Sequence, residues 1–221
     1  MSNQGSNDDT KPLLPLQEPV MTPQLQLAIR LLSTAAADLP ALLADWKIRH
    51  PGAILELSPG DVDPHDVRER ELIAEDPGHQ PFFYYDEEPF PQLGADVWVF
   101  GNPPQARANG RALPRFKAAF DEAALTRSAA DIRNASWLIR GLRQRARTYE
   151  QVIAAVIGIR PRLAIAPDPS QVEPVTVGVV AEIIGVHEST VRRVAGACRF
   201  QTLHGVMRLV ADGKWLGFAR A

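Results

Sequence analysis

Apolar residues near the front of the chain recur at helical spacing. The positions of Leu25, Ile29 and Leu32 predict a helix that begins near Pro23, because proline suits the first helical position. A break at 38–40 separates this helix from a second short helix. Both are too short to be stable alone, so we expect them to dock on a partner.

The longest helical pattern runs from residue 113 to residue 159, and Trp137 lies on its apolar stripe, so we expect this ring in the core. Before it, residues 96–100 alternate in polarity and predict a strand or small hairpin that ends at 101–104. These patterns predict a mainly α fold: a small helical bundle with a minor β element, followed by a helix-turn-helix.

The chain divides into five segments by composition. Residues 82–85 form an aromatic run that we expect to pack on a neighbour. The segments are a disordered tail (1–20), N-terminal helices (21–50), an acidic Pro-rich linker (51–92), a mostly helical region (93–160) and a helix-turn-helix region (172–215).

Composition limits the class of protein. The hydrophobic fraction of 45% permits a packed core, whereas nineteen prolines require much loop. A single cysteine, Cys198, excludes an internal disulfide and a zinc finger. The sequence has neither a signal peptide nor an apolar run long enough to cross a bilayer, so we expect a cytoplasmic protein with no membrane contact.

The net charge of −2 conceals an asymmetry along the chain. Residues 56–88 contain eleven carboxylates and two arginines, whereas residues 127–147 contain six arginines and one acid. Residues 186–221 contain six Lys or Arg and two acids. An acidic middle followed by a basic half suggests that nucleic acid or another acidic surface meets the second half.

Residues 176–196 have the spacing of a helix-turn-helix. Ala181 is the small residue where two crossing helices touch, and Gly185, four positions on, permits the tight turn. Val191 and Val194 then bury the second helix against the first, and Thr176 can cap the first helix. Without basic residues on the exposed face, the same spacing would also fit an ordinary two-helix corner.

The second helix exposes side chains that suit a major groove. Arginine can pair bidentately with guanine, and Ser or Thr can bind phosphate or base edges. The predicted DNA-binding residues are His187, Glu188, Ser189, Thr190, Arg192 and Arg193. The preceding long helix is also rich in arginine, but a solvated helix face explains these residues more simply than a binding site does. They are Arg133, Arg140, Arg143, Arg145 and Arg147.

Four stretches in collinear order resemble bacterial sigma-54 transcription initiation factors. Residues 186–193 read VHESTVRR, close to the recognition helix of that family, although Arg192 stands where a serine is usual. Residues 135–149 are similar to the family's Ala-x-Trp-Leu-Ile helix, and 95–100 to the end of its core-binding region. Residues 21–32, MTPQLQLAIRLL, resemble its activator-responsive region.

The resemblance implies three partners: core RNA polymerase, promoter DNA and an activator ATPase of the enhancer-binding type. It implies polymerase contacts from Arg133, Trp137, Arg140, Arg143 and Arg147, and activator contacts from Gln24, Leu25, Gln26, Ile29 and Leu32. The sequence departs from the family pattern in lacking most of the core-binding region, of which 93–160 would be a remnant, and the second promoter-reading domain.

Two alternatives remain beside a shortened sigma-54 factor. One is a stand-alone helix-turn-helix regulator, and the other is a degenerate copy that interferes with a full-length factor. The hypothesis that the chain is an enzyme has little support, because the five histidines are scattered and the sequence contains no Gly-rich phosphate loop and no metal-ligand spacing. We therefore expect no cofactor, no metal and no catalytic residues.

Overall fold

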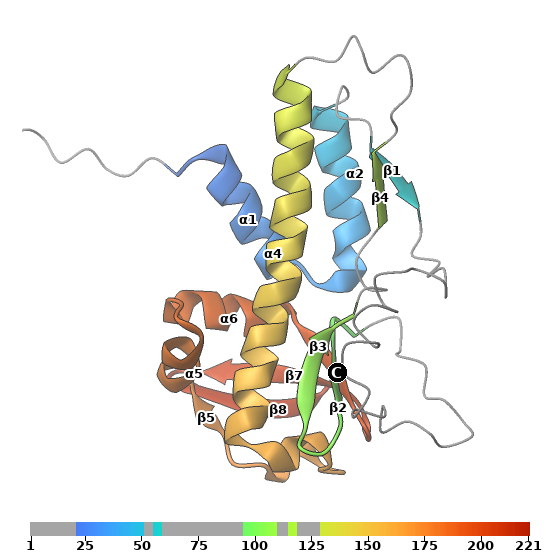
Figure 1. The fold of residues 1–221 in the computed structure, drawn as a ribbon. Helices are drawn as coiled ribbons and strands as arrows, with labels where there is room; N and C mark the ends of the chain where they lie inside the picture. The colour runs from blue at the N-terminus through green and yellow to red at the C-terminus, as the bar shows by residue number, and fades with distance from the viewer. Residues whose placement is uncertain (1–20, 51–54, 59–94, 110–114, 119–128) are drawn as a thin grey trace, which may run out of the picture.

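The computed structural model describes residues 21–50, 55–58, 95–109, 115–118 and 129–221 (Figure 1). Helices hold more of these residues than strands do, as predicted for a mainly α chain. The helices are α1 (Pro23–Ser33), α2 (Leu39–Arg49), α4 (Ala129–Ile159), α5 (Val177–Ile184) and α6 (Glu188–Ala197), with short 3-10 turns η1 (Ala36–Asp38), η4 (Pro161–Ala164) and η5 (Pro169–Gln171).

The β structure is larger than the minor element that the sequence predicted. A six-stranded sheet has the order β3-β2-β6-β7-β8-β5, and a separate antiparallel pair joins β1 to β4. The strands are β1 (Leu55–Ser58), β2 (Val97–Phe100), β3 (Gln105–Ala108), β4 (Arg115–Ala118), β5 (Val175–Thr176), β6 (Arg199–Thr202), β7 (Gly205–Asp212) and β8 (Trp215–Arg220). Among the strands of the described residues, only β2 and β6 pair in parallel.

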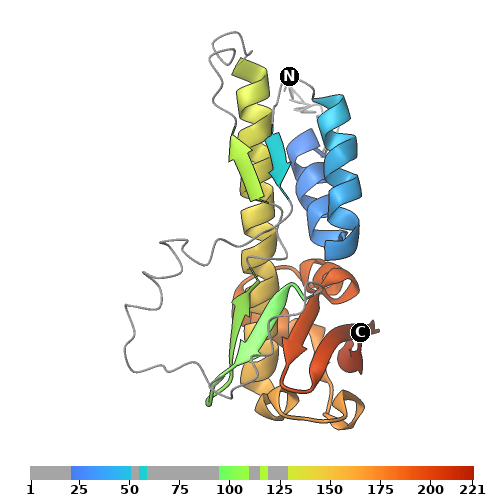
Figure 2. The ribbon, with the colours of Figure 1, turned by 90° about the vertical axis from the view of Figure 1, so that its right-hand side faces the viewer.

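The first helix begins where the sequence predicted. The amide of Leu25 donates to Oγ1 of Thr22 (3.3 Å), which caps the helix, and Pro23 takes the first position. Both N-terminal helices dock on α4 of the same chain, where they form one apolar cluster: Leu31, Leu39, Leu43, Trp46, Leu138 and Leu142. Figure 2 shows α1 and α2 beside one half of α4 and the sheet beside the other half.

The long helix starts later than predicted. Residues 115–118 form β4 instead, because the alternating sequence RFKA pairs antiparallel with 55–58. Helix α4 then runs from residue 129 to residue 159. Part of the predicted linker is therefore a strand, while its aromatic run 82–85, like the predicted tail 1–20, lies outside the described residues.

The main core lies where the second half of α4, the sheet and helices α5 and α6 meet. Its members alternate along the strands, as a sheet with one buried face requires. Phe200, Met207, Leu209 and Leu216 fill the sheet side, and Val152, Ile153 and Val156 fill the side of α4. Strands β6 to β8 thus close the core beneath α6.

Arg145 is the one exception among the arginines predicted to form a solvated face of α4. Its side chain is buried, and it donates to the main-chain carbonyls of Leu31 (3.0 Å) and Thr34 (3.1 Å) at the end of α1. The ring of Tyr149 lies 4.2 Å from its guanidinium carbon, and the Tyr149 hydroxyl donates to Leu32. These two α4 side chains fix the end of α1.

Candidate nucleic-acid interface

Helices α5 and α6 are joined by a short turn at Gly185. The amide of Val179 donates to Oγ1 of Thr176 (3.4 Å), so the predicted cap begins α5. Gly185 ends it with φ 67°, a left-handed conformation that an L side chain rarely adopts. His187 then starts α6, because its Nδ1 accepts from the amide of Ser189 (3.1 Å).

The two helices bury Ala181, Val191 and Val194, which the sequence predicted to lie where the helices meet. Val191 and Val194 of α6 are fully buried, and so are Val180 and Ala181 of α5. These side chains belong to the main core, which fixes the angle of α6 on the rest of the protein. The opposite side of α6 is thereby directed away from the core.

The six predicted DNA-binding residues all keep part of their surface in solvent. Arg193 donates to Oγ of Ser189 (3.3 Å), a contact within one turn of α6 that leaves its other donors available. The exposed or half-exposed set is His187, Glu188, Ser189, Thr190, Arg192 and Arg193. The α6 surface therefore presents donors, acceptors and one ring nitrogen to solvent.

Arg192 differs from Arg193 in that its guanidinium is already occupied. Its Nη2 lies 2.8 Å from Oε2 of Glu188, one turn earlier on α6. Its Nη1 donates to the carbonyl of Gly213, in the turn between β7 and β8. Arg192 thus connects α6 to a hairpin that the sequence did not predict.

A second exposed surface lies along the first half of α4. The five predicted polymerase-contact residues are spaced three or four positions apart, which places them on one helix face, and the structure leaves all five exposed: Arg133, Trp137, Arg140, Arg143 and Arg147. The prediction of a core Trp137 is wrong, because its ring is 45% exposed, with the Arg140 guanidinium 5.9 Å above it. Leu138 and Leu142 bury the opposite face instead.

The predicted activator-contact residues divide along α1. Gln24, Leu25 and Gln26 are exposed in the first turn, whereas Ile29 and Leu32 are partly buried. Leu32 packs against the main core, and α1 contacts both α4 and α6. The free end of α1 is therefore accessible, while its other end is held by the protein.

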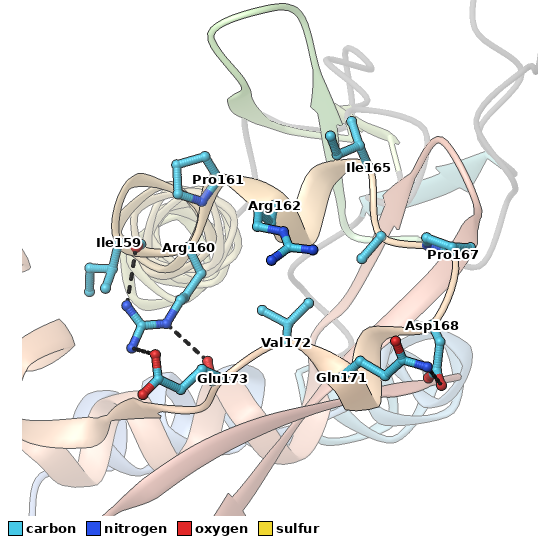
Figure 3. A pocket seen from close by; sticks show the side chains of 11 residues that line it. Ile159, Arg160, Pro161, Arg162, Ile165, Pro167, Asp168, Gln171, Val172 and Glu173 are labelled. Carbon is cyan, nitrogen blue, oxygen red and sulfur yellow. Dashed lines mark hydrogen bonds and ion pairs between the residues drawn. The ribbon is translucent and has the colours of Figure 1, made fainter.

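A cavity of about 410 Å³, which the sequence analysis did not predict, lies beside the end of α4 (Figure 3). Its walls come from the Pro-rich connector at 159–173. Arg160 bonds to the carbonyl of Glu173 (3.0 Å) and to its carboxylate (3.0 Å). Hydrogen bonds from Ser170 and Gln171 lower the pKa of Asp168. These polar groups hold the connector together rather than converge on a ligand.

Within the ranges that the structure covers, no three His, Cys, Asp or Glu side chains are grouped to hold a metal ion. Nor does any helix in those ranges have the length and apolarity needed to cross a membrane.

Known proteins match the part of the chain that carries both surfaces. The family described as "Sigma-54, DNA binding domain" matches residues 126–211, which include α4, α5 and α6. Residues 126–211 are therefore similar to the DNA-binding domain of sigma-54 proteins. The match confirms the resemblance of 135–149 and 186–193, which lie inside it, and it is to a DNA-binding domain rather than to an enzyme, as predicted.

Two similar proteins are RNA polymerase sigma-54 factors. The chain is 30% identical over 164 residues to the RNA polymerase sigma-54 factor of Caulobacter vibrioides, a match that covers 67% of this chain and 32% of the relative. It is 35% identical over 78 residues to the RNA polymerase sigma-54 factor of Azorhizobium caulinodans, covering 35% of this chain and 15% of that protein. The chain thus spans about a third or less of the sigma-54 factors it matches.

Proposed function

We propose that this chain is a sigma-54-like transcription initiation factor, which binds core RNA polymerase and promoter DNA and responds to an activator ATPase. The observation that carries the proposal is the placement of α6 within the matched DNA-binding domain. Its apolar side is fixed by Val191 and Val194, and its polar side faces solvent. The chain itself performs no catalysis in this proposal.

Helices α5 and α6 are the proposed helix-turn-helix, with α6 in the major groove. An α-helix with its side chains is about 10–12 Å wide, which fits a groove about 12 Å wide. Arg193 has guanidinium donors left for a guanine edge, and His187 and Ser189 lie at the N-terminal end of α6 where base contacts are usual. Arg192 contributes less to base contacts, because its guanidinium is held by Glu188 and Gly213.

The exposed face of α4 is the proposed polymerase surface. Arginines around an exposed indole are common at protein interfaces, because both side chains supply contact area and directional bonds. Trp137 with Arg140 over its ring fits that description. Such a surface on a rigid helix fixes the distance between polymerase and the DNA held by α6.

The N-terminal helices are the proposed receiver of the activator. Helix α1 contacts both α4 and α6. A partner that binds the exposed Gln24, Leu25 and Gln26 would therefore be able to move α1 relative to α6, the proposed DNA-binding helix. The buried bonds from Arg145 and Tyr149 to the end of α1 oppose this movement. An ATPase would supply the work that breaks them.

One recognition helix makes few phosphate contacts, so this chain alone should bind DNA weakly and lose affinity steeply as salt rises. Attachment to polymerase would make the DNA contact effectively intramolecular and thereby raise the apparent affinity without any new DNA contact. The proposal therefore predicts that tight promoter binding requires polymerase.

Transcription from a sigma-54-type promoter tests the proposal. Purified core polymerase, the activator and ATP are combined with and without the full chain, and RNA is measured. We expect transcription only when chain, activator and ATP are all present. A chain that binds the promoter but does not co-purify with core polymerase would instead be a stand-alone regulator. A chain that binds polymerase and blocks a full-length factor would be an interfering copy.

A further inference from the structure

The turn between β7 and β8 lies against the DNA-facing helix. Residues 212–215, here called the hairpin tip, join the two strands through a two-residue connection at Gly213 and Lys214. Gly213 has φ 52°, as the first central residue of a tight hairpin turn requires. Its carbonyl accepts from Arg192 of α6, so the tip is attached to the helix.

The strands hold the tip in this place from the other side. Strand β8 pairs with β7 and with β5, the short strand directly before α5. The amide of Val177, the first residue of α5, donates to the carbonyl of Lys214 (2.8 Å). Figure 1 accordingly shows β7 ending beside α5 and α6. The tip is therefore bonded to both helices at a fixed position.

A helix that fills the major groove leaves little room beside it. An element packed along the side of that helix must lie over the groove wall, which consists of the sugar-phosphate backbone. We propose that the hairpin tip contacts the phosphate backbone next to the segment that α6 reads, with the Lys214 ammonium as the charge that binds it. This inference rests on the proposed role of α6 in DNA binding.

The exposed chemistry of the tip suits a phosphate contact. Lys214 and Trp215 are both exposed, and the Lys214 ammonium lies 5.4 Å from the indole centroid. The ring limits the freedom of the lysine and offers an apolar surface to a deoxyribose. Asp212 is the opposing charge at the same turn, so its carboxylate should weaken the contact. The matched residues of the DNA-binding family end at 211, so the tip lies outside that match.

Arg192 acts as a positioning residue in this arrangement. The Glu188 carboxylate holds one of its nitrogens, and a second nitrogen holds the tip. The tip and the first turn of α6 are thus one surface, and a shift of the tip would shift Lys214 relative to the groove. The sequence predicted that Arg192 contacts DNA directly. In this inference Arg192 instead holds the hairpin tip, which makes a second contact with DNA.

Binding of the full chain to fluorescein-labelled duplexes tests the inference. One duplex carries a promoter of the Caulobacter vibrioides factor and the other an unrelated sequence, and anisotropy is followed from 50 to 200 mM salt. We expect Lys214→Ala to weaken binding to both duplexes equally. Because one phosphate contact contributes about 0.9 to the salt slope, this fourfold rise in salt should cost Lys214→Ala about 3.5-fold less affinity than it costs the unmodified chain. Asp212→Asn should strengthen binding to both.

Lys47→Ala is the matched control, because Lys47 is an exposed lysine on α2. A Lys214→Ala chain with the affinity and salt slope of Lys47→Ala would overturn the inference. Arg193→Ala separates this failure from failure of the proposed function. Loss of promoter preference in Arg193→Ala with no effect of Lys214→Ala overturns the tip contact alone. Absence of any DNA binding by the unmodified chain, with or without polymerase, overturns both.

Discussion

The guanidinium of Arg145 lies 2.8 Å from Oδ1 of Asp96, and both side chains are 1% exposed. The other carboxylate oxygen of Asp96 accepts from the amide of Arg199 (2.9 Å), at the start of β6. This ion pair therefore joins α4 to β2 and β6, while the same guanidinium holds the end of α1. The N-terminal helices and the sheet meet at one buried arginine.

Replacing Arg145 with alanine should strongly destabilise the protein. The substitution leaves the Asp96 carboxylate buried without its cation and the carbonyls of Leu31 and Thr34 without a donor. Breaking a buried pair in this way costs about 3–5 kcal/mol in the free energy of unfolding. Urea denaturation followed by circular dichroism measures this cost.

Arg143→Ala is the control for that measurement, because Arg143 is exposed on the same helix two residues earlier. It should change the free energy of unfolding by no more than about 0.5 kcal/mol. Equal stabilities for the two variants would mean that the Arg145 contacts do not hold the three elements together.

A larger side chain at Gly141 should displace α1. A Cβ at Gly141 would lie only 2.8 Å from Cδ1 of Leu31, which is fully buried. Gly141→Leu should therefore cost about 1–3 kcal/mol through overpacking and free the end of α1. Limited digestion with trypsin should then cut after Arg30 faster than in the unmodified chain.

Gly158→Leu is the control, since a Cβ at that α4 position meets nothing within 4 Å. It should leave the rate of cleavage after Arg30 unchanged. If both variants are cut at the same rate as the unmodified chain, the close packing of α1 on α4 at Gly141 is disproved.

A buried thiol and a buried phenol should make the free energy of unfolding fall at high pH. Burial raises the pKa of the Cys198 thiol and of the Tyr149 hydroxyl. The unfolded chain releases these protons from about pH 8.5 and about pH 10, whereas the folded chain keeps them. Because only the folded form stays protonated in this range, the free energy of unfolding falls as the pH rises above about 8.5. Urea denaturation between pH 7 and pH 10.5 measures the decline.

The variants Cys198→Ala and Tyr149→Phe show which of the two groups causes each part of that decline in stability. Cys198→Ala should remove the part that starts near pH 8.5, and Tyr149→Phe should remove only the part near pH 10. Their absolute stabilities also change, so the slope with pH is the quantity to compare. Identical slopes in all three chains would show that neither proton is retained on folding.

The elements that could be predicted from the sequence depend on local signals. Thr22 and Pro23 start α1, Thr176 caps α5, and Gly185 ends it, all within a few residues of the features they determine. The buried Val191 and Val194 followed from helical spacing alone. The geometry of two helices joined by a short turn is local, so a short sequence contains most of its determinants.

The missed features depend on distant partners. Arg145 is indistinguishable by spacing from the exposed arginines around it, because its burial depends on Asp96 and on Leu31, which lies 114 residues away in the sequence. For β7 and β8 a signal did exist. Met207, Leu209, Leu216 and Phe218 alternate on either side of the Gly-Lys turn, a pattern typical of a hairpin. It was obscured by the helical pattern directly before it.

Arg193→Ala should weaken promoter binding by about 1–3 kcal/mol if this guanidinium pairs with a base. The loss should be confined to the promoter duplex, and the salt slope should stay unchanged, because a base contact releases no phosphate counterion. A phosphate contact would instead lower the slope and weaken binding to any duplex. Anisotropy titrations on promoter and unrelated duplexes distinguish these cases, with Lys47→Ala as the charge control. An unchanged footprint and affinity would remove Arg193 from the DNA interface, and with it the orientation of α6 on which the groove assignment depends.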